Sequence, residues 1–268
     1  LAWRHAYCGL FSMEKDGVTW YFLDNEQYFD RPELYGYVDD GERFGFFSRA
    51  VVKMLDHLEF WPDVIHCNDW QTALIPIYLK DDGVREDRYR SIRTGLTIHN
   101  IEYQGRYDPY CLGDLFGLDR GWVDDGTLLL DGDLNLLKGA ILTADAVSPT
   151  YAQELKNPYF AHRMEGILTQ CGYKLSGVLN GIDMKLYDPA ADGRITANYT
   201  AEDLSGKAAD KTALQNLMGL NEEPNTPIIA MESRLVSHKG LDLLRGDMGD
   251  IMELPAQFVV LGSGDAGY

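Results

Sequence analysis

Short apolar runs and helical segments alternate along the first third of the chain, and this order constrains the fold more than any other feature. A short strand predicted at 63–67 is followed by a helical segment at 70–79 and then by another predicted strand at 94–98. Two strands joined by a helix pair in parallel, because the crossover returns the chain to the same end of the sheet. The sequence therefore predicts an α/β fold with helices layered on a parallel sheet.

The same patterning predicts elements on both sides of this unit. A β-rich run at 18–23 is expected to form a buried strand, and apolar residues at helical spacing predict a helix over 42–58. Further helices are expected at 134–142, 149–155, 207–217 and from 239 onward, and further strands at 146–148, 175–179, 227–232 and 258–261. The polar segment 188–226 carries little β signal, so we expect a first domain over 1–180 and the start of a second over 181–268.

Charge and composition exclude several classes of protein. The net charge of −18 argues against a general polyanion binder, since phosphate backbones are held by clustered Lys and Arg. No stretch approaches the roughly 18 consecutive apolar residues of a membrane-spanning helix. The four cysteines are scattered without a CxxC pair, and the chain opens at Leu1 without secretory signal features. We expect a cytoplasmic protein with reduced thiols, and neither nucleic acid nor membrane as a partner.

Polar clusters follow three of the predicted strands, where ligands bind in open parallel sheets. They are His66–Trp70, His99-Asn100 with Tyr103–Gly105, and Asn180–Asp183. Each polar residue has an alternative interpretation: Asp69 is well placed to cap a helix, and His99 can be a structural hydrogen-bonding residue. His66 beside Cys67 suggests a metal, yet the usual ligand spacings do not occur, so no metal site is predicted.

Two cations follow the strand expected at 227–232. Arg234 and Lys239 flank a loop that leads into a predicted helix, whose N-terminus carries a partial positive charge. This arrangement predicts a diphosphate site, and the alternative is a solvated loop with two surface cations. Gly262–Gly267 spells G-x-G-x-x-G after a strand, but the confirming helix and acidic residue are not found, so we interpret it as a glycine turn. A dinucleotide-dependent oxidoreductase is the distant alternative.

Taken together, these motifs resemble the family of bacterial glycogen synthases and plant starch synthases, which are ADP-glucose-dependent retaining glucosyltransferases. The resemblance extends from Trp3-Arg4 to Gly264-Asp265, and the motifs occur in the family's order and approximate spacing. The matching segments are HCNDWQTAL (66–74), TIHNIEYQG (97–105), AVSPTYA (146–152), LSGVLNGID (175–183) and SRLVSHKGL (233–241).

The resemblance implies a GT-B fold: two Rossmann-like domains, with the nucleotide sugar held mainly by the C-terminal one. It implies transfer of glucose from ADP-glucose to the non-reducing end of an α-1,4-glucan, with no metal and no further cofactor. The implied catalytic residues are Asp69, His99, Arg234 and Lys239, the cations holding the departing diphosphate. The implied substrate-binding residues are Tyr35, Asn100, Tyr103 and Asn180, together with Arg234 and Lys239.

Departures from the family pattern affect what this chain is expected to do alone. The family's Lys-x-Gly-Gly-Leu loop and its Glu-Pro-Cys-Gly-Leu segment do not occur here, and Glu232 stands where the family usually has an apolar residue. We therefore expect a chain incomplete at both ends that is inactive by itself, because concerted sites lose most of their rate when one member is missing. The alternative is a non-catalytic, glucan-binding pseudoenzyme fragment. The sequence does not decide whether the donor is ADP-glucose or UDP-glucose. It also leaves open the exact acceptor, the regulation and the oligomeric state.

Overall fold

The computed structural model describes residues 1–148 and 150–268, and of Arg85 and Thr150 it describes the backbone only. The chain divides into two compact units, Leu1–Leu179 and Asn180–Tyr268. The expected domains of 1–180 and 181–268 placed this division one residue later. Each unit is described by itself below.

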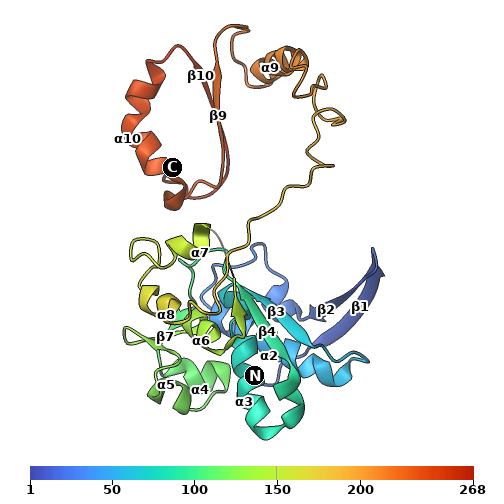
Figure 1. The fold of residues 1–268 in the computed structure, drawn as a ribbon, viewed down its shortest axis with the longest axis vertical. Coiled ribbons are helices and arrows are strands. Elements are labelled where there is room, and N and C mark those ends of the chain that lie inside the picture. Colours follow the sequence, from blue (N-terminus) through green and yellow to red (C-terminus); the bar gives the residue numbers. More distant parts are fainter. Residues whose placement is uncertain (149) are drawn as a thin grey trace. The chain divides into compact units, whose positions relative to one another are not determined.

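A three-stranded parallel sheet forms the centre of the first unit (Figure 1). Its strands are β3 (Val64–Asn68), β4 (Arg93–Thr97) and β8 (Ala146–Val147), in the order β3-β4-β8. The parallel α/β arrangement predicted from the sequence is confirmed. The strand expected at 175–179 is wrong: Leu175 forms only an isolated bridge to Val147. The apolar side chains beyond it, Val178 and Leu179, are exposed, so they do not join the core.

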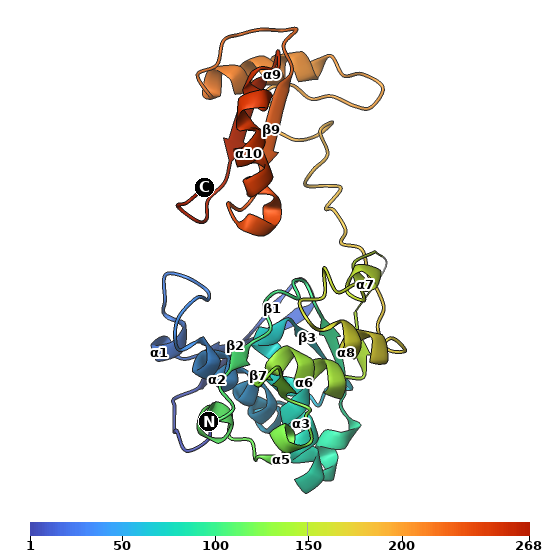
Figure 2. The same cartoon turned by 90° about the vertical axis from the view of Figure 1, so that its left-hand side faces the viewer.

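Three helices carry most of the core beside this sheet. They are α2 (Asp40–Met54), α3 (Leu74–Arg85) and α6 (Leu136–Thr143), with α3 in contact with both of the others (Figure 2). Shorter helices complete the layer: α1 (Glu26–Phe29), α4 (Cys111–Phe116), α5 (Gly121–Asp124), α7 (Thr150–Glu154) and α8 (Glu165–Gln170). Single 3₁₀ segments lie at Leu55–His57, Trp70–Thr72 and Asp87–Ser91. The helix expected at 149–155 begins at Pro149, which lies outside the described residues.

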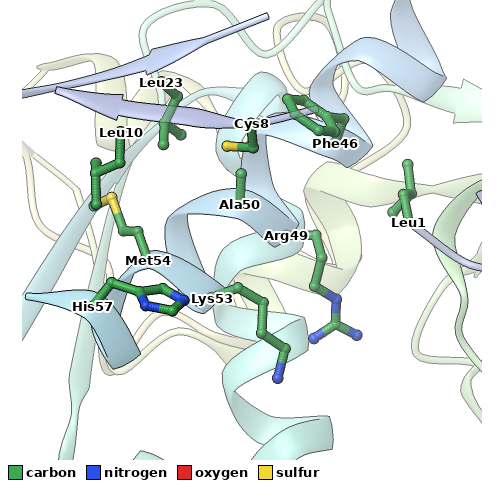
Figure 3. A pocket seen from close by; sticks show the side chains of 10 residues that line it. All are labelled: Leu1, Cys8, Leu10, Leu23, Phe46, Arg49, Ala50, Lys53, Met54 and His57. Carbon is green, nitrogen blue, oxygen red and sulfur yellow. The ribbon is translucent and has the colours of Figure 1, made fainter. Parts of the chain in front are cut away.

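An antiparallel hairpin of β1 (Gly9–Lys15) and β2 (Val18–Asp24) extends away from the central sheet (Figure 1). The expectation of a buried strand at 18–23 is wrong, because the successive apolar residues 20–23 place apolar side chains on both faces of the strand and only one face is covered. One face lies over α2, and the cavity of about 410 Å³ between them is lined by Leu10, Leu23, Phe46, Ala50 and Met54, among others (Figure 3). The opposite face, with the cross-strand pairs Phe11–Phe22 and Met13–Trp20, is about half exposed.

A small antiparallel sheet, not anticipated from the sequence, lies next to the start of α6. Its strands are β5 (Arg106–Tyr107), β6 (Leu129–Leu130) and β7 (Asp133–Asn135), in the order β5-β7-β6. Its strands are too short for a period of two to be visible in the sequence. The sheet matters for the site because it fixes Asn135 beside the loop that follows β4.

The second unit contains a parallel pair of strands, β9 (Ile228–Glu232) and β10 (Gln257–Leu261), joined through α10 (Leu241–Met252). A 3₁₀ turn, Ser237–Lys239, precedes α10, and α9 (Gly206–Leu217) precedes β9. Within Gly262–Gly267, interpreted from the sequence as a glycine turn, only Ala266 and Gly267 lie in a turn, and Gly264 forms an isolated parallel bridge to Leu235. In neither unit do the described residues include a helix long and apolar enough to cross a membrane.

Candidate active site

Asp69 joins the ends of β3 and β4. Its backbone N–H donates to the carbonyl of Thr97 at 2.9 Å, and its Oδ1 accepts from the N–H of His99 at 2.7 Å and from that of Asn100 at 3.4 Å. The capping interpretation of Asp69 is wrong, since its side chain makes no cap bond to the 3₁₀ turn that follows it. The carboxylate instead holds the loop after the neighbouring strand.

The backbone of Asp69 has φ 55° and ψ −171°. Residues other than glycine rarely adopt this region, and holding one there costs on the order of 1–3 kcal/mol. Strained backbone of this kind persists where the surroundings impose it, and it concentrates at functional sites. The hydrogen bonds to Thr97, His99 and Asn100 are the contacts that impose it here.

Two histidines are oriented by neutral side chains of the same strand ends. His99 is exposed, and its Nε2 lies 3.0 Å from Oδ1 of Asn68. His66 Nε2 lies 2.7 Å from Oγ1 of Thr97. The amide of Asn68 therefore fixes how the His99 ring is presented beside Asp69, a role that sequence reasoning did not assign.

The buried side-chain amide of Gln104 holds the loop from His99 to Gly105. Gln104 Nε2 donates to the carbonyls of Ile101 and His162, each at 3.1 Å, and its Oε1 accepts from Asn135 Nδ2 at 2.6 Å. Gly105 has φ 63°, and a Cβ there would run into the ring of Trp70, so only glycine fits. These contacts hold the loop on which Tyr103, 46% exposed, faces solvent.

Tyr151 also belongs to this cluster, although sequence reasoning missed it. Its hydroxyl oxygen accepts from the backbone N–H of Ile101 at 3.0 Å. Burial raises the pKa of Tyr151, and the negative charge of Asp69 adds to that rise. The phenol is thus kept neutral beside the carboxylate. The signal for it was its position two residues after Pro149 in the stretch 146–152, which was noted only as part of a motif.

Tyr35 lies in a separate part of the first unit, in the irregular loop between α1 and α2. It lines a cavity of about 330 Å³, which we call the Tyr35 cavity. The other lining residues are mostly aromatic or charged: Leu23, Phe29, Arg31, Glu33, Leu34, Arg43, Phe44, Phe47 and Gln71. Gln71 comes from the 3₁₀ turn directly after Asp69, so the cavity adjoins the strand-end cluster through that turn.

The remaining predicted residues belong to the second unit. Arg234 and Lys239 are both exposed, and no ion pair is recorded for either among residues 1–148 and 150–268. A hydrogen bond joins the backbone between them to the residues that follow β10: the N–H of Leu235 donates to the carbonyl of Ser263 at 2.9 Å. Gly240, at φ 76°, then turns the chain into α10. Glu232 is exposed at the end of β9, and Asn180 is exposed where the unit begins.

The structure therefore brings Asp69, His99 and Asn100 together at the ends of β3 and β4, with Tyr103 exposed on the loop that follows β4. It places Tyr35 at its own cavity, and Arg234 and Lys239 on one loop of the second unit. Over the described part of the chain, no three His, Cys, Asp or Glu side chains are grouped to hold a metal ion. Cys67 is a buried core residue, and this burial raises the pKa of its thiol to about 12, so the thiol stays protonated at neutral pH.

Comparisons with known proteins agree on one family. Residues 1–170 match the family described as the starch synthase catalytic domain. The whole chain aligns with glycogen synthases from Lactobacillus acidophilus (45% identical), Ligilactobacillus salivarius (46%) and Bacillus cereus (44%). In each case it spans only 57% of the relative's length.

Solved structures point to the same fold. The catalytic domain of starch synthase IV from Arabidopsis thaliana, bound to ADP and acarbose, is 34% identical with a TM-score of 0.86, covering 97% of this chain and 55% of that one. A UDP-forming α,α-trehalose-phosphate synthase from Burkholderia vietnamiensis, 13% identical with a TM-score of 0.51 over 98% of this chain and 56% of that one, shares the fold alone. The fold is thus of the GT-B type, and the chain belongs to the starch synthase catalytic domain family of glycosyltransferases.

Proposed function

We propose that this chain is part of a glycogen or starch synthase, a retaining glycosyltransferase that moves glucose from ADP-glucose to the non-reducing end of an α-1,4-glucan. The observation that carries the proposal is the Asp69 carboxylate, which holds the His99 and Asn100 amides at the ends of two parallel strands. Ligands bind at such strand ends in α/β folds. The relatives named glycogen synthase support the same activity.

The residues divide into two roles under this proposal. His99, Asn100 and Tyr103 contact the transferring glucose beside Asp69. Tyr35 is a further sugar-binding residue of the first unit. Asn180 is a substrate-binding residue at the start of the second unit. Arg234 and Lys239 bind the two phosphates of the donor. Glucosyl transfer leaves negative charge on the departing diphosphate, and positioned cations lower that barrier. Their exposure and the absence of recorded ion pairs within the described chain leave both cations available for an anion.

The specificity for ADP-glucose, the absence of a metal requirement and a cytoplasmic location are predictions within this proposal. So is the inactivity of this chain alone, with a glucan-binding module as the alternative. The structure of a starch synthase bound to ADP and acarbose supports a nucleotide diphosphate and an oligosaccharide as the ligand classes.

The test is calorimetric titration of maltoheptaose and of ADP-glucose, separately, into the 268-residue chain. We expect the chain to bind maltoheptaose. We also expect donor binding that Asp69→Ala, Tyr103→Ala, Arg234→Ala and Lys239→Ala each weaken, because the first two residues lie at the transferring glucose and the two cations hold the phosphates. Glu14→Ala, an exposed residue of β1, is the control and should change neither. Binding of neither ligand to the wild-type chain would refute the proposal for this chain. UDP-glucose bound more tightly than ADP-glucose would refute the choice of donor.

A further inference from the structure

The loop that carries Tyr35 is organised around one buried ion pair. Arg43, on the first turns of α2, is 2% exposed and pairs with Asp40 one turn earlier. Burying a charged pair costs several kcal/mol per ion in desolvation, so such pairs persist only where geometry and additional hydrogen bonds compensate. The additional bonds of this pair all go to the chain that precedes α2.

Arg43 uses its planar fork to hold two backbone segments. Its Nε donates to the carbonyl of Tyr28 at 2.7 Å, and its Nη2 donates to the carbonyl of Leu34 at 3.2 Å. The remaining Nη1 donates to Asp40. An ammonium group cannot reproduce this fixed set of directions, so lysine is not equivalent here.

Asp40 completes the hold from its other carboxylate oxygen. Its Oδ2 accepts from the N–H of Gly36 at 2.6 Å and from the N–H of Tyr37 at 3.2 Å. Leu34, Gly36 and Tyr37 surround Tyr35 in the chain, so the ion pair fixes the backbone on both sides of that residue. Gly36 has φ 101°, which other residues rarely adopt, and a Cβ there would meet nothing within 4 Å.

The Tyr35 cavity has the lining that a sugar ring needs. Tyr35, Phe29, Phe44 and Phe47 supply aromatic surface for the apolar C–H faces of a pyranose. Arg31, Glu33 and Gln71 supply polar groups for its hydroxyls. A mostly apolar hollow with a few placed polar groups is the usual form of a small-ligand site.

We propose that the Arg43–Asp40 pair is a positioning device, which holds the loop 31–38 so that Tyr35 and its neighbours form a binding subsite for a glucose unit of an α-glucan. The choice of glucan as ligand rests on the proposed function. Arg43 and Asp40 act through the loop: Arg43 is a positioning residue, and Tyr35 makes the contact.

The experiment uses two independent perturbations of the loop in the 268-residue chain. Arg43→Lys keeps the charge and removes the fork, whereas Gly36→Ala strains the loop and leaves the ion pair intact. The matched controls are Arg49→Lys and Gly17→Ala. Arg49 lies on the same helix, pairs with Asp82 at 2.7 Å and faces the other cavity (Figure 3). Gly17 has φ 74° in the turn between β1 and β2, also with open space at its Cβ.

Two readouts separate positioning from general loss of structure. Amide hydrogen exchange at Gly36 and Tyr37 should accelerate in Arg43→Lys, while exchange in β3 and β4 stays as in the wild type. The Kd for maltoheptaose should rise about tenfold, the equivalent of about 1.4 kcal/mol, in both Arg43→Lys and Gly36→Ala. Both controls should bind maltoheptaose as the wild type does.

The outcomes are distinguishable from failure of the proposed function. Wild-type binding with unchanged affinity in Arg43→Lys and Gly36→Ala would overturn this inference alone. Equal weakening by the controls would overturn it too, because the effect would then be a general loss of structure. If the wild type binds no maltoheptaose, the glucan assignment falls together with the acceptor of the proposed function, and hydrogen exchange still decides whether the pair holds the loop. If Arg43→Lys does not fold, Gly36→Ala decides the glucan subsite.

Discussion

Asp69 allows a sharp test, because replacing it with glycine and with alanine should give the reverse of the usual order of stability. Glycine normally makes a folded protein less stable than alanine by roughly 0.5–1 kcal/mol, since it loses more conformational freedom on folding. At φ 55° and ψ −171°, however, alanine keeps a backbone strain of about 1–3 kcal/mol that glycine does not have.

Both variants lose the same hydrogen bonds. The bond at 2.7 Å to the His99 N–H is charge-assisted and contributes about 1.5 kcal/mol, the low end for such bonds because His99 is exposed to water. The contact at 3.4 Å to Asn100 adds less. We therefore expect Asp69→Ala to lower the free energy of unfolding by about 2 kcal/mol. Asp69→Gly should stay within about 1 kcal/mol of the wild type, because relief of strain offsets most of the loss.

The assay is urea denaturation followed by circular dichroism, with the slope of the transition checked for constancy. Asp145 supplies the matched control, since its Oδ2 also accepts from a backbone N–H, that of Thr94 at 2.8 Å, and its φ is not positive. There, alanine should be more stable than glycine. If Asp69→Ala proved as stable as Asp69→Gly or more so, the strain at this position would be refuted, and with it the interpretation that the site imposes it.

Further outcomes follow from other parts of the chain. Gln104→Ala should lower the free energy of unfolding by about 2–3 kcal/mol, because it leaves buried carbonyls unpaired; in the same denaturation assay, exposed Gln170→Ala should stay close to the wild type, and an equal loss there would contradict the role of Gln104. Although burial opposes it, hydrogen bonds from Thr94 and Arg93 hold the pKa of Asp145 below its usual value, so its stabilisation is present above about pH 4 and is lost as the pH falls further. In urea titrations from pH 6 to 3, the free energy of unfolding should fall less with decreasing pH in Asp145→Asn than in the wild type. An equal fall in both proteins would count against this. Limited proteolysis should cut within 180–268 first, since only three described residues there are buried; a resistant second unit would show otherwise.

The parallel sheet was predictable because its signal is local. Each of the segments 63–67 and 94–98 is short, contains β-branched residues and runs into polar residues, and a helix-length segment separates the two. This local pattern identifies both strands without knowledge of the partner strand. The hairpin failed for the opposite reason. Residues 20–23 of β2 form a continuous apolar run, and whether such a run is buried depends on what covers its second face, which no local pattern records.

The candidate site was predictable as a set of positions and not as a set of contacts. Asp69 and His99 could be placed at strand ends from the sequence, yet the choice between helix cap and inter-strand tie depended on the register of β3 against β4. Gln104 shows the same limit: its partner Asn135 lies 31 residues further along the chain, on a strand of three residues. Residues that make non-local polar contacts carry no distinguishing pattern around them.

The side chains that build this site have one property in common, because each satisfies backbone groups of a segment other than its own. Asp69 accepts from the loop after β4, Gln104 donates to the carbonyl of His162, and the Arg43–Asp40 pair holds the Tyr35 loop. Truncating any of these side chains therefore loosens the loop that it holds and also alters the surface that a ligand would contact. A loss of binding alone would not show which of these two changes caused it. Two kinds of variant separate these effects. Gly36→Ala adds no contact and changes only how firmly the backbone is held. Asp69→Gly and Asp69→Ala both lack the carboxylate, so the difference between them reports backbone strain alone.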